Sequence, residues 1–200
     1  MKFKSEMRIL GIDDAPHQRT QAGDRILAIG TMFRGGKVMD ALLTTHLTCD
    51  GDDVTKKFIQ MINKSRNKNQ LHAILTDGVT FGGFNVLDLG LLNKKTGIPV
   101  ISVVRHMPRF KKIQKAIKNV KHWEHKWNLI EKAGEVHETF ITNKSLKQPD
   151  NIFYQCKGIS AKDAARILKL TTLHGVIPEP LRAAHIIGSG IKFGESRGHA

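Results

Sequence analysis

The sequence has few cysteines, few aromatic side chains and no long apolar run. Cys49 and Cys156 are the two cysteines among 200 residues, too few for a disulfide framework. No stretch is long and apolar enough to span a bilayer, and the first ten residues, MKFKSEMRIL, lack the apolar core of a signal peptide. These absences exclude a disulfide-stapled secreted scaffold and a membrane protein. They predict a cytoplasmic protein with no membrane partner.

Acidic residues are also scarce relative to basic ones. The chain has 32 Lys and Arg against 18 Asp and Glu, a net charge of +14 at pH 7. Residues 105–147 contain 11 basic and 4 acidic residues, and this balance of +7 is half of the total excess. Such a surface favours a polyanionic partner, most often nucleic acid, and we expect DNA rather than RNA.

The length and the apolar content of 40% suit one domain with a full hydrophobic core. We predict a single domain over residues 1–200. Within it we expect a basic helical segment at about 106–134 and a mobile tail at about 194–200.

The spacing of apolar residues predicts the order of the elements. Alternating or β-branched runs indicate strands, and 3.6-residue spacing indicates helices. We expect strands at 7–13, 26–33, 38–48, 71–77 and 98–104, and a strand pair within 136–142 and 151–156. We expect helices starting at 54, at 85–97, in one or two pieces over 108–134, at 160–173, and starting at 178 or 180.

This order, three strands followed by alternating helices and strands, predicts an α/β fold of the ribonuclease H-like class. The first three strands are expected to be antiparallel neighbours, because the turn RGGK at 34–37 joins two of them as a hairpin. The next two strands alternate with helices and are expected to run parallel. The result is a mixed central sheet flanked by helices.

Two aspartates follow strands of this sheet directly. Asp13 ends the first strand and Asp77 ends the fourth, and the two strands are expected to be neighbours. Two carboxylates on adjacent strands lie close enough to repel each other. A bound Mg²⁺ or Mn²⁺ would remove the free-energy cost of this repulsion. The glycines that follow, including Gly82 and Gly83, would let a substrate backbone approach. Salt bridges with the many Lys and Arg are the structural alternative for both acids.

A third acid could come from the segment between the third strand and the first helix. Asp50, Asp52 and Asp53 all lie there. For Asp52 or Asp53 taken alone, capping of the helix is the favoured reading, and Asp50 can serve as a turn residue before Gly51. The spacing of Asp50 and Asp52 also resembles haloacid-dehalogenase-like phosphatases, with Asp50 as nucleophile and Asp52 as acid–base.

At these acids the chain resembles an archaeal endonuclease dU-related family, itself a relative of endonuclease V. The matching segments are GIDDAPH (11–17), RGG (34–36), DGDDVT (50–55), DGVTFGGFNVLD (77–88), IPVISVVR (98–105) and PEPLRAAHIIGSGIKFGES (178–196). The resemblance implies the ribonuclease H-like fold and a Mg²⁺-dependent nuclease that acts near deaminated bases, uracil or hypoxanthine.

The resemblance also assigns residue roles. Asp13 and Asp77 match metal-binding acids, and Arg105 stands where the relatives carry a Lys that could hold phosphate. His185 would be a metal ligand or proton-transfer residue, although a histidine between Ala184 and Ile186 is more often packed in a helix. The second acid of endonuclease V is a Glu near the first helix. Here we favour Asp53, as a catalytic and metal-binding residue, and then Asp50, as a metal-binding residue.

The nucleic-acid contacts are expected around the site and along the basic segment. Lys111, Lys112 and Lys115 fall at helical spacings that present one positive face. The hairpin turn has no aromatic wedge of the endonuclease V kind, so the choice of lesion stays open. The expected contact residues are Arg34, Gly82, Gly83, Arg105, Arg109, Lys111, Lys112 and Lys115.

Three hypotheses remain. The first is the metal-dependent endonuclease, and the second is the phosphatase that uses Asp50 and Asp52. The third is a nucleic-acid-binding protein without catalysis, which the charge supports equally well. Trp123 and Trp127 could stack on exposed bases, but packing in the core is the favoured reading.

Overall fold

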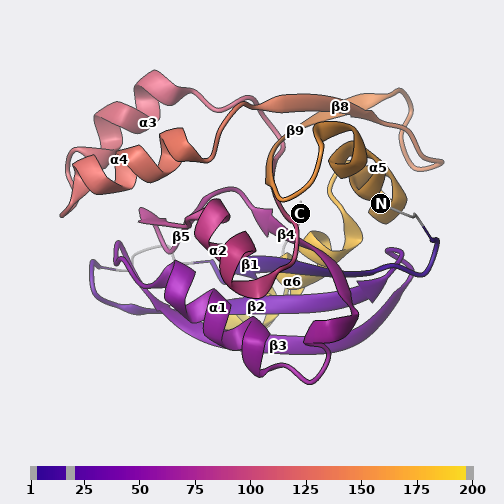
Figure 1. The fold of residues 1–200 in the computed structure, drawn as a ribbon, viewed down its shortest axis with the longest axis horizontal. Helices are drawn as coiled ribbons and strands as arrows, with labels where there is room; N and C mark the ends of the chain where they lie inside the picture. Colours follow the sequence, from indigo (N-terminus) through magenta and orange to yellow (C-terminus); the bar gives the residue numbers. More distant parts are fainter. Residues whose placement is uncertain (1–3, 17–20, 197–200) are drawn as a thin grey trace.

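A computed structural model describes residues 4–16 and 21–196 (Figure 1). Seven strands form one mixed sheet in the order β3-β2-β1-β4-β7-β9-β8, and helices cover both of its faces. The strands are β1 (Arg8–Asp14), β2 (Arg25–Arg34), β3 (Val38–Thr48), β4 (Leu71–Asp77), β7 (Val100–Val104), β8 (His137–Ile141) and β9 (Asp150–Lys157). The helices are α1 (Val54–Lys64), η1 (Lys68–Gln70), α2 (Leu89–Thr96), α3 (Phe110–Ile117), α4 (Trp123–Lys132), α5 (Ala161–Thr171) and α6 (Glu179–Phe193).

The strand directions agree with the predicted mixed sheet. β1, β2 and β3 are antiparallel neighbours, whereas β4 runs parallel to both β1 and β7. The predicted strand pair is confirmed as the hairpin β8–β9, which continues the sheet antiparallel to β7. In the part of the chain that the structure describes, no helix has the length and apolarity needed to cross a membrane.

The central strands are buried on both faces because helices cover each side. Leu10 and Ile12 of β1 pack in a cluster with α1 and α2. Ile9 belongs to a second cluster that includes residues of α5 and Leu181 of α6. Because successive side chains of a strand point to opposite faces, Asp13 continues the row of Ile9 and Gly11 toward α6.

The helix predicted at 85–97 is wrong at its start. Asn85–Val86 form the short strand β6, which pairs with β5 (Thr80–Phe81). The turn between them uses positive φ at Gly82 (51°) and Gly83 (86°), which suits a tight hairpin. The helix begins only at Leu89. Asp88 was expected inside the helix and is instead its N-cap, accepting a hydrogen bond from the Leu91 backbone N–H.

The basic segment forms two helices, α3 and α4, that lie beside the β5–β6 hairpin (Figure 1). They share a small apolar cluster in which Ile117 and Ile130 are buried against Val86. Trp123 and Trp127 pack partly buried against the same cluster, as favoured from the sequence. The predicted tail begins after α6, and its residues 197–200 lie outside the described part of the chain.

Candidate active site

Asp13 and Asp77 lie side by side at the carboxyl ends of two neighbouring strands. Ile12 pairs with Thr76 in the parallel β1–β4 ladder, so the next residues, Asp13 and Asp77, stand on adjacent strands about 4.8 Å apart. Both side chains are on the face that carries α6. The structure therefore brings together the two acids on which the metal hypothesis depends.

Helix α6 adds His185 to this pair. Its Nδ1 lies 3.1 Å from Oδ2 of Asp13, which is 4% exposed. The helix comes this close because β1 has a glycine at position 11. A Cβ there would stand 2.4 Å from the carbonyl carbon of Pro180, near the start of α6. The cluster thus joins residues from both ends of the chain.

The three groups perturb each other's protonation. Burial raises the pKa of Asp13 above its usual value, although the hydrogen bond with His185 opposes the rise. Desolvation by the surrounding protein atoms, together with repulsion from Asp13 and Asp14, raises the pKa of Asp77 to about 7. Asp77 is exposed to solvent at the end of its strand, so the repulsion from the two neighbouring carboxylates is the main cause of this rise in pKa. Its hydrogen bond with Asp13 raises the pKa of His185.

Asp14 was given no role from the sequence, and in the structure it binds the turn between β5 and β6 that contains Gly82 and Gly83. Its Oδ2 accepts a hydrogen bond of 2.9 Å from the Gly82 N–H. The Gly82 carbonyl in turn accepts from the Asp50 N–H, and Asp50 Oδ1 accepts from the Phe84 N–H at 2.7 Å. The sequence did hold a signal for this role. Two adjacent residues of a strand face opposite sides of the sheet, so Asp14 could not share the site of Asp13 and had to have a different partner.

In the structure, Gly82 and Gly83 allow their own loop to pack against Asp50. Gly82 is buried, and a Cβ on Gly83 would stand 2.4 Å from Asp50 Oδ1. The glycines therefore allow the loop to close over Asp50. Close approach of a substrate backbone, the reason expected from the sequence, is not needed to explain them.

Asp53 and Asp52 are held by partners other than Asp13. The Asp53 carboxylate accepts hydrogen bonds from the Thr48 N–H, the Thr48 hydroxyl and the Asn85 amide at 3.1, 3.0 and 2.6 Å. It makes no side-chain capping bond to α1. Burial alone would raise the pKa of Asp52, but its contacts with Lys126 and His122 lower it. The favoured second acid, Asp53, thus closes the turn between β3 and α1.

A buried lysine that the sequence did not single out anchors this region. Lys126 of α4 is 1% exposed, and its Nζ lies 2.7 Å from Oδ1 of Asp52. It also donates hydrogen bonds to the carbonyls of Asp50, Gly51 and Phe84. One ammonium group therefore ties the basic helices to both loops that border the acids. Its partners lie more than forty positions away along the chain, so no local pattern indicates it.

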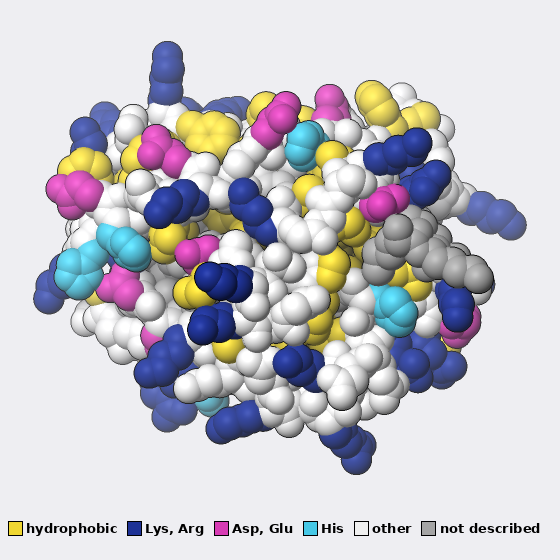
Figure 2. Space-filling view, in the orientation of Figure 1, with side chains coloured by type: hydrophobic (Ala, Val, Ile, Leu, Met, Phe, Trp, Pro, Cys, Tyr) yellow, Lys and Arg dark blue, Asp and Glu magenta, His cyan; other side chains and the backbone are white. Residues whose placement is uncertain are grey.

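The expected nucleic-acid contacts separate into two groups. Arg105 follows β7 directly and is exposed at the same edge of the sheet as Asp77, whose strand partner is Val103. The side chains of the α3 region are exposed as well: Arg109, Lys111, Lys112 and Lys115. Figure 2 shows that Lys and Arg outnumber Asp and Glu over one whole face of the molecule.

Arg34 lies at the opposite end of the sheet. It pairs with Arg8, five residues before Asp13 on β1, so about 16 Å separate it from the acids. Its guanidinium is engaged by Asp40 and Glu6. The glycine turn beside it packs on the end of α5, since a Cβ on Gly36 would stand 2.8 Å from the Thr171 carbonyl oxygen. The structure therefore does not bring Arg34 to the site.

The fold is similar to that of solved endonuclease V structures. The structure of endonuclease V from Ciona intestinalis, in complex with a 24mer DNA containing an inosine followed by a ribo-adenosine, matches with a TM-score of 0.56. The identity is 18%, and the match covers 89% of this chain and 82% of that one. The catalytic domain of human endonuclease V matches with a TM-score of 0.52 at 14% identity, over 89% and 79% of the two chains. The fold is therefore the predicted ribonuclease H-like one.

Closer relatives define the family. A sequence model for endonuclease dU matches residues 5–192. A UPF0215 protein of Methanothermobacter thermautotrophicus is 48% identical over 200 residues, which are 100% of this chain and 94% of the relative. The crystal structure of an Archaeoglobus fulgidus protein of unknown function matches with a TM-score of 0.80 at 31% identity, over 92% and 97% of the two chains. The chain belongs to the endonuclease dU family, which confirms the resemblance noted in its sequence.

Proposed function

We propose that this protein is a metal-dependent endonuclease that cuts a phosphodiester in nucleic acid containing a deaminated base, uracil or hypoxanthine. The observation that carries the proposal is the pair Asp13 and Asp77 on adjacent strand ends, with His185 against Asp13. Membership of the endonuclease dU family and a fold shared with endonuclease V support it. Such an activity belongs to the repair or processing of nucleic acid.

The residues present fit Mg²⁺ or Mn²⁺. Two neighbouring carboxylates, one of them with a pKa of about 7 in the absence of a cation, make a site that a hard divalent ion would stabilise. Among residues 4–16 and 21–196, no group of three His, Cys, Asp or Glu side chains is arranged to hold a metal alone. Water and phosphate oxygens would complete the coordination, as Mg²⁺ commonly requires. When bound, the ion would lower the pKa of a water molecule and offset the charge of the phosphate.

The other side chains of the site have complementary roles. His185 is held by Asp13 through Nδ1, and its raised pKa favours a protonated ring that can give a proton to the leaving oxygen. Arg105, just beyond β7, would bind a phosphate of the strand. Arg109, Lys111, Lys112 and Lys115 would follow the backbone without reading its sequence. The net charge of +14 suits DNA or RNA, and we propose DNA first.

A cleavage panel tests this function. Labelled oligonucleotides containing uracil, hypoxanthine, an abasic site or no lesion would be incubated with Mg²⁺ or Mn²⁺, as single and double strands. We expect metal-dependent cutting of one lesion and a loss of about 100-fold or more in Asp77→Asn. Undiminished cutting by Asp77→Asn would show that the assignment of the site is wrong.

The panel also separates the two alternatives. A binding protein without catalysis would give no product and would keep its affinity in Asp77→Asn. The phosphatase hypothesis requires Asp50 at the end of a central parallel strand. β3, which precedes Asp50, is instead an antiparallel edge strand, and Asp52 is held by Lys126 and His122. The fold therefore does not support a haloacid-dehalogenase-like phosphatase.

A further inference from the structure

A cavity of about 530 Å³ lies between α1, α2 and α4, away from Asp13 and Asp77. Helices α1 and α2 pack on the sheet face to which Leu10 and Ile12 point, whereas Asp13 points to α6 on the other face. Neither Asp13, Asp77 nor His185 lines the cavity. Its volume is in the range of small-molecule sites, which run from about 300 to 1,000 Å³.

Aliphatic side chains from four elements form one part of the wall. They are Ile59 of α1, Val86 of β6, Leu91 of α2 and Leu129 of α4. Leu91 is 38% exposed, on the side of α2 away from the buried Leu89 and Leu92. These side chains provide an apolar surface on which a flat ring could lie. Thr55 and Gln60 of α1 lie beside it with hydrogen-bonding groups.

The charged groups of the wall leave a positive excess. Asp52 is balanced by Lys126 and His122, with O···N distances of 2.7 and 2.8 Å. Asp88 is engaged as the N-cap of α2. Lys56 of α1, Lys95 of α2 and His125 of α4 are exposed, and the described residues offer their side chains no hydrogen bond or ion pair. Two lysines without partners face an apolar surface, so the complementary ligand is a flat ring that carries an anion.

We propose that this cavity binds a nucleotide, with the base on the aliphatic side chains and the phosphate held by Lys56 and Lys95. The same chemistry is offered by a free mononucleotide and by an unpaired nucleotide of a strand on the basic surface. Binding here needs no cutting at Asp13 and Asp77, so the proposal stands apart from the proposed nuclease activity.

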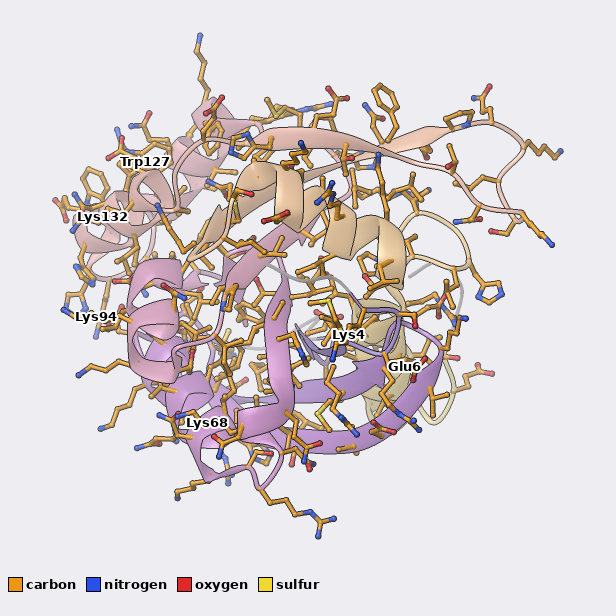
Figure 3. The ribbon with its side chains drawn as sticks, turned by 45° about the vertical axis from the view of Figure 1, so that its right-hand side comes forward. Lys4, Glu6, Lys68, Lys94, Trp127 and Lys132 are labelled. Atoms are coloured by element: carbon orange, nitrogen blue, oxygen red, sulfur yellow. The ribbon has the colours of Figure 1, made fainter. Side chains whose placement is uncertain are left out.

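Calorimetric titration of the full chain tests the site. Uridine and inosine 5′-monophosphate are the probes, with inorganic phosphate for comparison and a short single-stranded oligonucleotide as the alternative source. We expect binding of at least one nucleotide probe, weaker by about tenfold or more in Lys56→Gln/Lys95→Gln and in Leu91→Asp. Lys94→Gln is the matched control, because Lys94 is exposed next to Lys95 but does not line the cavity (Figure 3).

Each outcome decides between supporting and overturning the site. Binding of the mononucleotides supports a free ligand, and binding of the oligonucleotide alone supports a nucleotide of a strand, provided that the double variant weakens it. Equal affinity for inorganic phosphate, or equal affinity of the double variant, Lys94→Gln and the unmodified chain, overturns the proposal. Asp77→Asn is expected to bind as the unmodified chain does, even if cleavage fails, and loss of binding in that variant would assign the nucleotide to the acids instead.

Discussion

At the scale of single residues, Asp77 makes the protein sensitive to pH. Its folded-state pKa of about 7 lies above the usual aspartate value of 3.8, so the folded chain binds more protons than the unfolded chain between these values. Stability therefore falls as the pH rises from about 4 to about 7. Above this range the full repulsion with Asp13 remains.

We therefore expect Asp77→Asn to melt higher than the unmodified chain at pH 8 without metal. The gain should be about 1 kcal/mol after allowance for solvent screening, or about 2–4 °C in Tm, and should vanish at pH 3.5. Differential scanning fluorimetry in a chelating buffer would measure it. Added Mg²⁺ should raise the Tm of the unmodified chain only. A difference in Tm that is the same at both pH values would contradict this account of Asp77.

The sequence could predict residues whose role is local and not those defined by distant partners. Asp13 and Asp77 were predictable because each directly follows a buried strand, and parallel neighbours end at the same edge. Asp14 and Lys126 were missed, since their roles depend on contacts with Gly82 and with the carbonyls of two loops. Such pairings come from tertiary packing, which local periodicity does not encode.

At the scale of elements, Lys126 fastens α4 to the loops beside the acids. Lys126→Met keeps most of the length of the side chain and removes its ammonium, which leaves three part-buried carbonyls and Asp52 without this partner. We expect a loss of about 2–4 kcal/mol in the free energy of unfolding, measured by urea denaturation. Lys132→Met, on the exposed end of the same helix (Figure 3), should change it by about 0.5 kcal/mol or less. Equal losses in the two variants would show that the buried contacts do not stabilise the fold.

The β5–β6 turn makes a second test at this scale. Gly83→Ala adds a Cβ that would stand 2.4 Å from Asp50 Oδ1, at a φ of 86°. Gly97→Ala imposes a similar φ of 75° with nothing within 4 Å. We expect a cost of about 1 kcal/mol at Gly97 from backbone strain alone and clearly more at Gly83. Thermal denaturation would compare them, and a smaller cost at Gly83 would mean that the loop is free to move away from Asp50.

Element boundaries failed where a strand and a helix share one apolar run. Residues 85–97 satisfy helical spacing, yet Asn85 and Val86 pair with the strand before the glycine turn. The side chain of Asn85 accepts from the Val54 N–H and donates to the Asp53 carboxylate, so it is committed to α1 rather than to α2. Long strands and helices such as β3 and α5 were predictable because their pattern continues over eleven residues each.

At the scale of the whole molecule, the charge of +14 predicts binding that depends on salt. Each phosphate neutralised contributes a slope of about −0.9 for a duplex in a plot of log K against log salt concentration. Replacing the four exposed cations Arg109, Lys111, Lys112 and Lys115 by Gln should make the slope shallower by about two to four units. Fluorescence anisotropy at several salt concentrations would measure this, with Lys68→Gln (Figure 3) as a control far from α3. An unchanged slope would place the nucleic acid on another surface.

The contact between His185 and Asp13 joins positions 172 residues apart and has a consequence for the order of assembly. A chain that has folded its sheet but has not yet docked α6 already holds both acids at their strand ends. Such a chain lacks the imidazole of His185 next to Asp13, and Pro180 does not yet pack on Gly11. The three groups therefore come together only when α6 packs against β1. Any chemistry that needs all three groups therefore requires α6 to be docked on β1.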